Sequence, residues 1–491
     1  MAIEVCSLTR KLNMKKHLNI WYSEIDQNYT TNRRGVYYMI ANNDLNKQLP
    51  NELKSKFKEL KVLKHLKKAG ISKTSGFPCA YLFQLIFCLI FENKNWFRTL
   101  EGKKSTEIPA KDAIYRFLNQ STFAWRRFLH FLAAYTAGRV TKLTSHDRPK
   151  VFILDDSSYD RNRSKNVELL ARCFDHASQK MRFYKGFRML TLGWSDGATF
   201  LPIDFSLLSS KTSQINGISS KIDKRSSGYK RRLESLQTAP EQIPDMIQRA
   251  MNAGIEASYV LMDTWFTHQP LIKDIKEQGL DVIGMVKKLK QRYLVDGERV
   301  SLDQLYRLAT PTDGKKGALR AIHTIQANGI PVKVVFVRNR NKKSDWLAIL
   351  STDCTLSDQD IIRIYGMRWD IEVFFKTTKS LLKLQKEFQG RSYDSLISHT
   401  TIVFTRYIVL SWQNRCNTDQ RTLGGIFYEL CDEISDLDWA VALQQLIELL
   451  EDTFKKSNKK VQKLIKSQLQ QWIANLPNYI KLYLPISVCE S

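Results

Sequence analysis

The sequence predicts an α/β fold whose sheet lies in the middle of the chain, between two helical flanks. Short apolar runs alternate with amphipathic stretches from residue 151 to residue 286, which is typical of strand, helix and strand units. Short strand-like segments separated by turns follow from there, and both flanks have helical periodicity. The predicted domains are helical 1–148, α/β 149–395 with a β-rich insertion at about 287–353, and helical 396–491.

Composition places the chain among globular proteins that bind a polyanion. Its 491 residues are 43% hydrophobic and 11% aromatic, which is enough to build more than one core. Lys and Arg number 76 against 49 Asp and Glu, so the formal net charge is +27. This excess favours nucleic acid as the partner, with an anionic membrane surface as the second choice.

Nothing in the sequence predicts a membrane segment or a secreted protein. The longest apolar run, Tyr81 to Phe91, has about half of the roughly 20 residues that a membrane span needs, and predicts a buried helix. Met1 to Trp21 contains no apolar signal-peptide region. The eight cysteines are scattered without a Cys-x2-Cys spacing. A reduced cytoplasmic protein without disulfides or a zinc site is therefore expected.

The first flank, 1–148, is basic as well as helical. Asn51 to Lys68 places apolar residues at helical spacing among seven lysines. This pattern suits a solvated amphipathic helix or one that faces DNA. A helical DNA-binding domain fits, although no helix-turn-helix signature identifies the helix that reads DNA.

The central domain begins with a buried strand that leads into two acids. Val151 to Leu154 is the apolar run, and Asp155 and Asp156 follow it directly. Residues 189–194 and 200–208 predict a hairpin. The same layout recurs further on, where the predicted elements are a helix at 240–253, a strand from Tyr259 that ends near Asp263, a helix at 268–278 and a strand at 281–286.

Between the hairpin and the next helix lies a strongly basic segment, Lys211 to Arg232. It is polar and contains Gly and Ser, which predicts a mobile loop. Two interpretations fit its cations equally: solvated surface charge, or contact with phosphates.

A stretch from Ile364 to Leu382 predicts a helix with two distinct faces. At about 100° per residue, Tyr365, Arg368, Glu372 and Lys379 fall within an arc of roughly 60°, and the apolar residues fill a separate arc. The polar stripe alone would be explained by a surface ion pair between Arg368 and Glu372. It also combines one carboxylate with cations and a phenol, which is the mixture that a metal-dependent phosphoryl-transfer site needs.

Three carboxylates make this second interpretation stronger. Active groups of parallel sheets lie at the carboxyl ends of strands, where Asp155 and Asp263 are both predicted. With Glu372 they could hold two Mg²⁺ ions, which activate a water or a 3′-hydroxyl and stabilise the leaving oxygen.

These residues resemble the bacterial insertion-sequence DDE transposases of the insertion-sequence-four family. That family carries Tyr-x2-Arg-x3-Glu-x6-Lys, which Tyr365, Arg368, Glu372 and Lys379 match in type and spacing. The segments Trp346-Leu-Ala-Ile-Leu-Ser-Thr and Asp263-Thr-Trp-Phe are also similar to the family. The resemblance covers about residues 151–382.

The resemblance implies a ribonuclease-H-like core that a β-rich insertion interrupts before the last acid. Asp155, Asp263 and Glu372 would be the catalytic acids and would bind two Mg²⁺ ions, or Mn²⁺. Asp156 is the alternative first acid, because Asp-x-Ser/Thr fits at both positions. Strand alternation favours Asp155, since it would turn Asp156 to the other face.

The resemblance also implies how DNA is bound. Tyr365, Arg368 and Lys379 would contact the phosphates of double-stranded transposon ends. Trp346 would either stack on a flipped base or be a core residue. The expected assembly is a homodimer in a synaptic complex, with the C-terminal helical domain as a candidate for dimerisation, in the bacterial cytoplasm at the nucleoid.

The predicted function is a DNA transposase that cleaves at its terminal inverted repeats and joins the 3′ ends to target DNA. Two alternatives belong to other classes: a transposase-derived DNA-binding protein without catalysis, and a metal-dependent nuclease that cleaves without joining.

Overall fold

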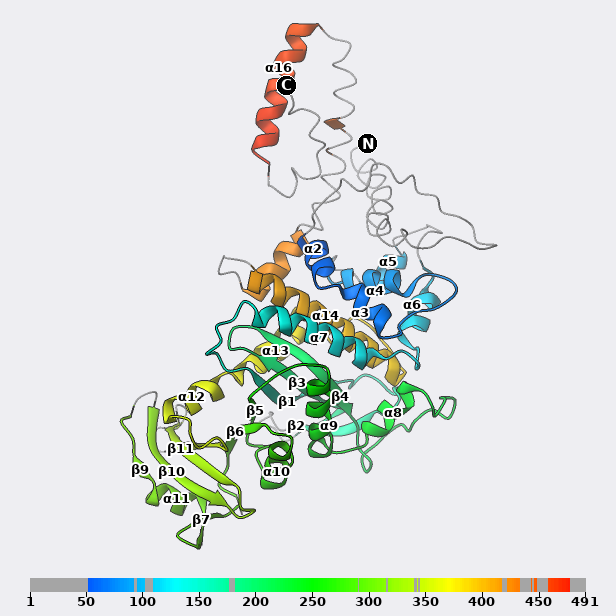
Figure 1. The fold of residues 1–491 in the computed structure, drawn as a ribbon. Helices are drawn as coiled ribbons and strands as arrows, with labels where there is room; N and C mark the ends of the chain where they lie inside the picture. The colour runs from blue at the N-terminus through cyan, green and yellow to red at the C-terminus, as the bar shows by residue number, and fades with distance from the viewer. Residues whose placement is uncertain are drawn as a thin grey trace. The chain divides into compact units, whose positions relative to one another are not determined.

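The computed structural model describes residues 52–91, 95–101, 109–175, 182–289, 291–314, 317–339, 345–416, 422–432 and 458–476, with a few isolated positions. Contacts divide the chain into two compact units. The first consists of Met1–Leu63, Ser72–Phe117 and Arg421–Ser491, and the second of Lys64–Ile71 and Leu118–Gln420. Figure 1 shows the elements of both units by label.

The first unit is helical where the structure describes it, as predicted. Its central helix is α4 (Cys79–Cys88), the apolar run, and eight of its ten residues are buried. The Phe57 and Phe87 rings lie 5.0 Å apart, and those of Phe91 and Phe427 lie 5.6 Å apart. Other helices of this unit are α2 (Glu52–Glu59), α5 (Trp96–Glu101), α6 (Lys111–Leu118) and α16 (Lys459–Ala474). The short helix α3 (Val62–Lys68) spans the boundary, with most of its residues in the second unit.

The second unit is built on one large mixed sheet. At its centre, β1 (Val151–Asp160) runs parallel to β5 (Tyr259–Met262), and β5 runs parallel to β6 (Asp281–Val286). β3 (Arg182–Ser195) pairs antiparallel with β1 and with β4 (Phe200–Leu208), which confirms the predicted hairpin. β2 (Ala171–Asp175) pairs with β3 at this end of the sheet.

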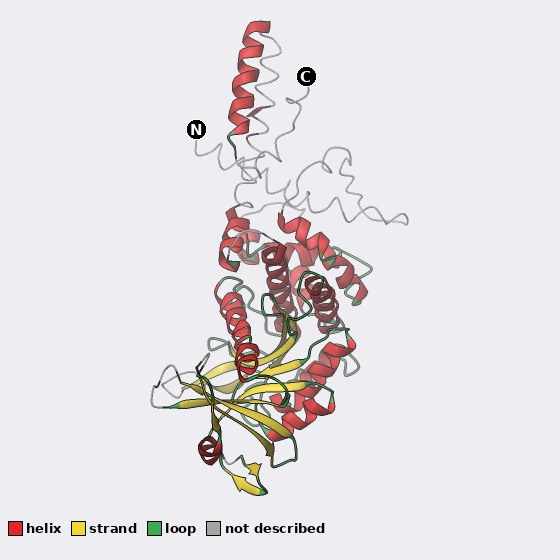
Figure 2. Ribbon diagram, turned by 60° about the vertical axis from the view of Figure 1, so that its left-hand side comes forward, coloured by secondary structure: helices red, strands yellow, loops and turns green. Residues whose placement is uncertain are grey.

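The β-rich segment 287–353 extends this sheet and is not a separate one. β12 (Trp346–Ser351) pairs antiparallel with β6, with Ile349 opposite Met285. Beyond β12, the sheet continues through the other strands of the insertion. Figure 2 shows the strands in yellow. Its other elements are β7 (Tyr293–Val295), β8 (Glu298–Val300), α11 (Leu302–Leu308), β9 (Thr310–Pro311), β10 (Ala318–Gln326) and β11 (Pro331–Arg338).

Helices bury the central strands. α7 (Trp125–Thr141) and α14 (Tyr393–Cys416) lie side by side and both contact β4 (Figure 1). α9 (Ala239–Asn252) also packs on β4, which is buried at all nine positions, and α10 (Gln269–Glu277) packs on β6. None of the described helices is long and apolar enough to cross a membrane.

The compact units follow different boundaries from the three predicted domains. α7 precedes residue 148, and most of α14 follows residue 395, yet both lie in the unit that contains the sheet. Their apolar faces explain this placement, because α7 and α14 cover the sheet that the sequence between them forms. The roles assigned to the domains stay predictions.

The stretch predicted as one helix from Ile364 to Leu382 is two helices, α12 (Asp358–Gly366) and α13 (Trp369–Ser380). Between them the Arg368 N–H donates to the Tyr365 carbonyl at 3.0 Å, three residues back, which is a tighter turn than an α-helix makes. Gly366, a poor helix former, ends α12. The polar stripe is therefore shared by two helices.

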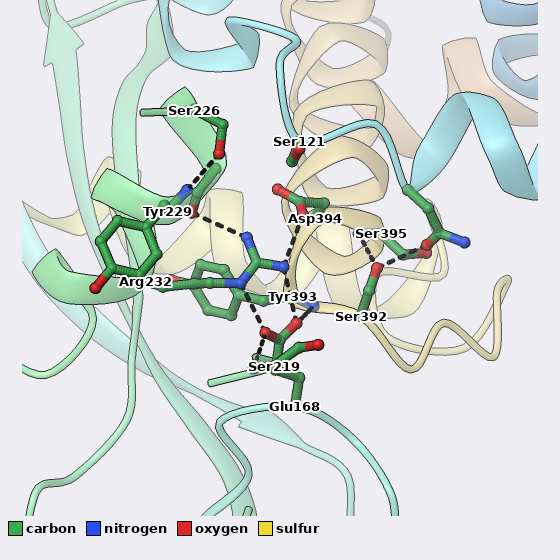
Figure 3. A network of polar contacts seen from close by, with 12 residues as sticks. Ser121, Glu168, Ser219, Ser226, Tyr229, Arg232, Ser392, Tyr393, Asp394 and Ser395 are labelled. Atoms are coloured by element: carbon green, nitrogen blue, oxygen red, sulfur yellow. Dashed lines mark hydrogen bonds and ion pairs between the residues drawn. The ribbon is translucent and has the colours of Figure 1, made fainter. Parts of the chain in front are cut away.

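Part of the basic segment Lys211 to Arg232 is buried. Its end forms α8 (Ser227–Glu234), where the side chains of Arg231 and Arg232 are only 6% and 2% exposed. Figure 3 shows the Arg232 guanidinium between Glu168 and Asp394, at 2.7 Å from each. Both interpretations of this segment are wrong for these two arginines, because they neutralise buried carboxylates.

Candidate active site

The sheet brings two of the predicted acids to neighbouring positions. The parallel pairing of β1 and β5 ends at Leu154 opposite Met262, and the next residues along the chain are Asp155 in β1 and Asp263 directly after β5. β1 itself continues to Asp160, because β3 pairs along its whole length. Asp155 thus lies inside a strand and not at its carboxyl end, contrary to the prediction from the sequence.

Asp263 begins the turn between β5 and α10. Its Oδ1 accepts hydrogen bonds from the backbone N–H groups of Trp265 at 2.9 Å and Phe266 at 3.3 Å. Such bonds hold the carboxylate in one orientation at the end of its strand.

Arg368 joins two of the acids. Its Nη1 donates to Asp155 Oδ2 at 3.1 Å, and its Nη2 donates to Glu372 Oε1 at 2.7 Å. The Arg368 and Asp155 side chains are 16% and 17% exposed, whereas Glu372 is 40% exposed. The contact between Arg368 and Glu372 is therefore part of a shielded cluster and not an isolated surface pair.

The pKa of Asp155 is raised by its surroundings. Burial and the neighbouring Asp263 carboxylate raise the pKa of Asp155 to about 7, although Arg368 lowers it. Burial also raises the pKa of Tyr365 to about 12. A carboxyl whose pKa is raised by a second carboxylate is a common feature of catalytic and metal-binding sites.

Asp156 has different partners from Asp155. It forms an ion pair with Arg188 of β3, and it follows Asp155 in the strand, so the two side chains point to opposite faces. Arg368 contacts Asp155.

Lys379 reaches back from α13 to β1. Its Nζ contacts the Ser157 hydroxyl and lies 3.3 Å from the Ser158 hydroxyl. The Gln385 side chain, beyond α13, donates to the Ser158 carbonyl at 2.8 Å. The lysine therefore lies two to three residues along β1 from Asp155.

Trp346 belongs to an aromatic cluster in the insertion. Its ring stacks on Tyr306 at 4.8 Å and meets the Phe336 ring edge-on at 4.9 Å. The Lys288 ammonium lies 4.3 Å from the centre of the Trp346 ring. The side chain is half-buried, so it combines features of the two roles considered for it.

Comparison with known proteins bears on the part of the chain that holds the first two acids. Residues 104–336 match the family model of the DDE superfamily endonucleases. The match includes Asp155 and Asp263 and ends before Glu372. It supports a nuclease of the transposase type.

Two further comparisons add little to the DDE match. No curated protein matches this chain. Among solved structures, the Drosophila P element transposase strand transfer complex is similar at 10% identity, over 90% of this chain and 84% of that chain, with a TM-score of 0.20. That score is too low to support an argument.

The donor chemistry of Asp155, Asp263 and Glu372 fits a divalent cation, which prefers carboxylate oxygens. In the part of the chain that the structure describes, no three His, Cys, Asp or Glu side chains are close enough to hold a metal ion. The Arg368 guanidinium instead supplies the positive charge between Asp155 and Glu372. If Arg368 moved away, a divalent cation bound by the carboxylates would replace the positive charge that it supplies.

Sequence reasoning missed three residues that surround these acids: Arg188, Ser157 and Gln385. Arg188 lies on the hairpin, opposite Ser158 in the antiparallel register. Arg188 contacts Asp156, which lies 32 positions earlier in the sequence, so only the pairing of β1 with β3 could have shown this contact.

Proposed function

We propose that this protein is a DNA transposase that cleaves at the terminal inverted repeats of an insertion sequence and joins the 3′ ends to target DNA. The observation that supports this most directly is that Asp155 and Glu372 both contact Arg368, with Asp263 directly after the adjacent strand β5. The match to the DDE endonuclease family over residues 104–336 supports the same reaction class.

Asp155, Asp263 and Glu372 would hold two Mg²⁺ ions, or Mn²⁺ in their place. Bound there, the ions would supply activation of the attacking water or 3′-hydroxyl and stabilisation of the leaving oxygen. Asp155 is proposed as the first acid in preference to Asp156, since Asp155 faces Arg368 and Asp156 pairs with Arg188.

Double-stranded DNA would lie along the cations and hydroxyls beside the acids. We assign phosphate contacts to Tyr365, Arg368 and Lys379, and a base-stacking role to Trp346. The net charge of +27 supports a polyanionic substrate. Arg368 would exchange its bonds to the acids for a phosphate when metal and DNA bind together.

The finer assignments rest on the resemblance to the insertion-sequence-four family. They comprise a ribonuclease-H-like core with an insertion, a homodimeric synaptic complex and action at the bacterial nucleoid. A nuclease that cleaves without joining is the second candidate, because the family model that matches is described as an endonuclease. A DNA-binding protein without catalysis is less well supported, since all three acids are present.

Replacing Glu372 with Gln tests the nuclease. On a duplex that carries the element's terminal repeat, the wild type should nick the end in Mg²⁺ and not in a chelator. Glu372→Gln should lower the cleavage rate at least about a hundredfold, because a lost metal ligand removes several kcal/mol of transition-state stabilisation. Binding to the same duplex should persist.

Glu277→Gln is the matched control. Glu277 is 64% exposed on α10 and makes only a surface pair with Lys273, so this variant should cleave like the wild type. Binding without cleavage by the wild type would contradict the proposal and favour a DNA-binding protein. Nicked ends that are never joined to a target would favour the nuclease.

Lys379→Gln tests the phosphate contacts. The variant should bind DNA more weakly, and the slope of log affinity against log salt should fall by about 0.9, the value for one lost phosphate contact. Lys376→Gln, on the exposed side of the same helix, is the control and should change neither quantity. Equal slopes for the two variants would make Lys379 an ordinary surface residue.

A further inference from the structure

The turn that begins with Asp263 also presents a large aromatic ring to solvent. Trp265 is 50% exposed, two residues after Asp263. Its backbone N–H donates to Asp263 Oδ1 at 2.9 Å, so the acid and the indole are held by the same turn. Burial of a Trp side chain is strongly favourable, and an exposed one beside a candidate catalytic acid suggests a ligand.

Buried residues anchor this turn against the sheet. Phe266 and Thr267 are 1% and 4% exposed, and Thr267 Oγ1 donates to the Asp263 carbonyl at 2.6 Å. Gly284 of β6 lies so close to Thr267 that a Cβ there would clash with its side chain. The backbone of the turn that carries Trp265 is therefore held in place against the sheet.

A cation connects the indole to the strand that carries the first acid. The Arg188 guanidinium carbon lies 5.6 Å from the centre of the Trp265 ring. Arg188 also pairs with Asp156, the neighbour of Asp155. Because Arg188 lies over one face of the indole, a nucleobase would stack on the other face while the cation holds its phosphate.

We propose that Trp265 stacks on an unpaired nucleobase next to the phosphate that the site cleaves. The inference rests on the proposed function and adds a binding residue to it. Trp346 lies within an aromatic cluster of the insertion, whereas Trp265 follows Asp263 by two residues. A base on Trp265 would fix the adjacent phosphate relative to the acids.

The test uses the full-length chain with Glu372→Gln, so that DNA is not cut. The probes are two short duplexes of one sequence, in which 2-aminopurine is either paired or unpaired. Stacking on Trp265 should quench the unpaired 2-aminopurine and give that duplex the higher affinity. Trp265→Ala should lower its affinity about tenfold and abolish the quenching, and Trp265→Phe should retain most of both.

Trp472→Ala is the control, because Trp472 is 42% exposed on α16 in the other compact unit. It should leave both duplexes unaffected. An equal loss of affinity for both duplexes in Trp265→Ala, or no preference for the unpaired base in the parent, would overturn the inference. The quenching readout needs no cleavage. If the wild type never cuts DNA but quenching still depends on Trp265, the proposed nuclease activity is refuted and the stacking inference stands.

Discussion

Asp155→Asn is expected to abolish strand cleavage and also to raise the free energy of unfolding of the metal-free protein by about 2–4 kcal/mol above pH 7. Asp155 has a pKa of about 7 in the folded protein against 3.8 as its ordinary value, because of burial and Asp263. A carboxyl with a raised folded pKa binds its proton more tightly when folded, so ionisation favours unfolding.

The pH dependence identifies the cause. The stability of the wild type should fall as pH rises from about 4 to about 7, and then level off. Asn at position 155 has no proton to lose, so the two proteins should be alike near pH 4 and differ most above pH 7. Urea unfolding in a chelator at several pH values measures this difference. If the difference in stability between the two proteins were the same at every pH, ionisation of Asp155 would not be its cause.

Asp156→Asn is the internal control, since it is the alternative first acid and the adjacent residue. It removes the ion pair with Arg188, and we expect no gain in stability from it. Mg²⁺ should stabilise the wild type and have little effect on Asp155→Asn, because a ligand that binds only the folded state stabilises it. Cleavage retained by Asp155→Asn and lost in Asp156→Asn would exchange the two roles.

Local pattern predicted part of the elements that carry the acids, although not the length of β1 or the division of the 364–382 stretch into α12 and α13. The apolar runs before Asp155 and Asp263 predicted β1 and β5, and the spacing in the 364–382 stretch predicted the contact of Arg368 with Glu372. These features depend on neighbours within four residues or on burial of a single strand, both of which the sequence records.

Features that depend on distant partners could not be predicted. From the sequence, Arg232 was expected to be a solvated cation or a phosphate contact, because its partners Glu168 and Asp394 lie 64 and 162 positions away. The continuity of the insertion with the central sheet depends on the pairing of β12 with β6, and short strands alone do not specify their partners. Charge patterns in a sequence therefore indicate a partner of opposite sign without saying which one.

Arg406→Met is expected to destabilise the folded protein by about 3–5 kcal/mol, the cost of leaving one member of a buried ion pair alone. The Arg406 side chain is fully buried in α14 and donates to both oxygens of Glu387, at 2.7 and 3.0 Å. His399 also contacts Glu387, at 2.9 Å. Arg406 with these contacts holds the pKa of Glu387 at about 2, despite burial that raises it.

Equilibrium urea unfolding at pH 7 measures the loss, and the exposed Arg225→Met is the matched control. Arg225 is 91% exposed, so its replacement should change stability by less than about 0.5 kcal/mol. Replacing Glu387 with Leu together with Arg406→Met should recover much of the loss, because no charge is then buried alone. A double variant no more stable than Arg406→Met would show that packing, and not charge, explains the loss.

The position of this pair connects stability to the candidate site. Glu387 lies in the segment between α13, which ends at Ser380, and α14, so its bonds to α14 hold the chain that follows the helix carrying Glu372 and Lys379. Arg161, which follows β1, donates to the Phe388 carbonyl at 3.3 Å and ties the same segment to the strand of Asp155. At temperatures where Arg406→Met stays folded, we therefore expect slower cleavage with DNA affinity little changed, since a small shift of Glu372 affects reacting atoms more than phosphate contacts.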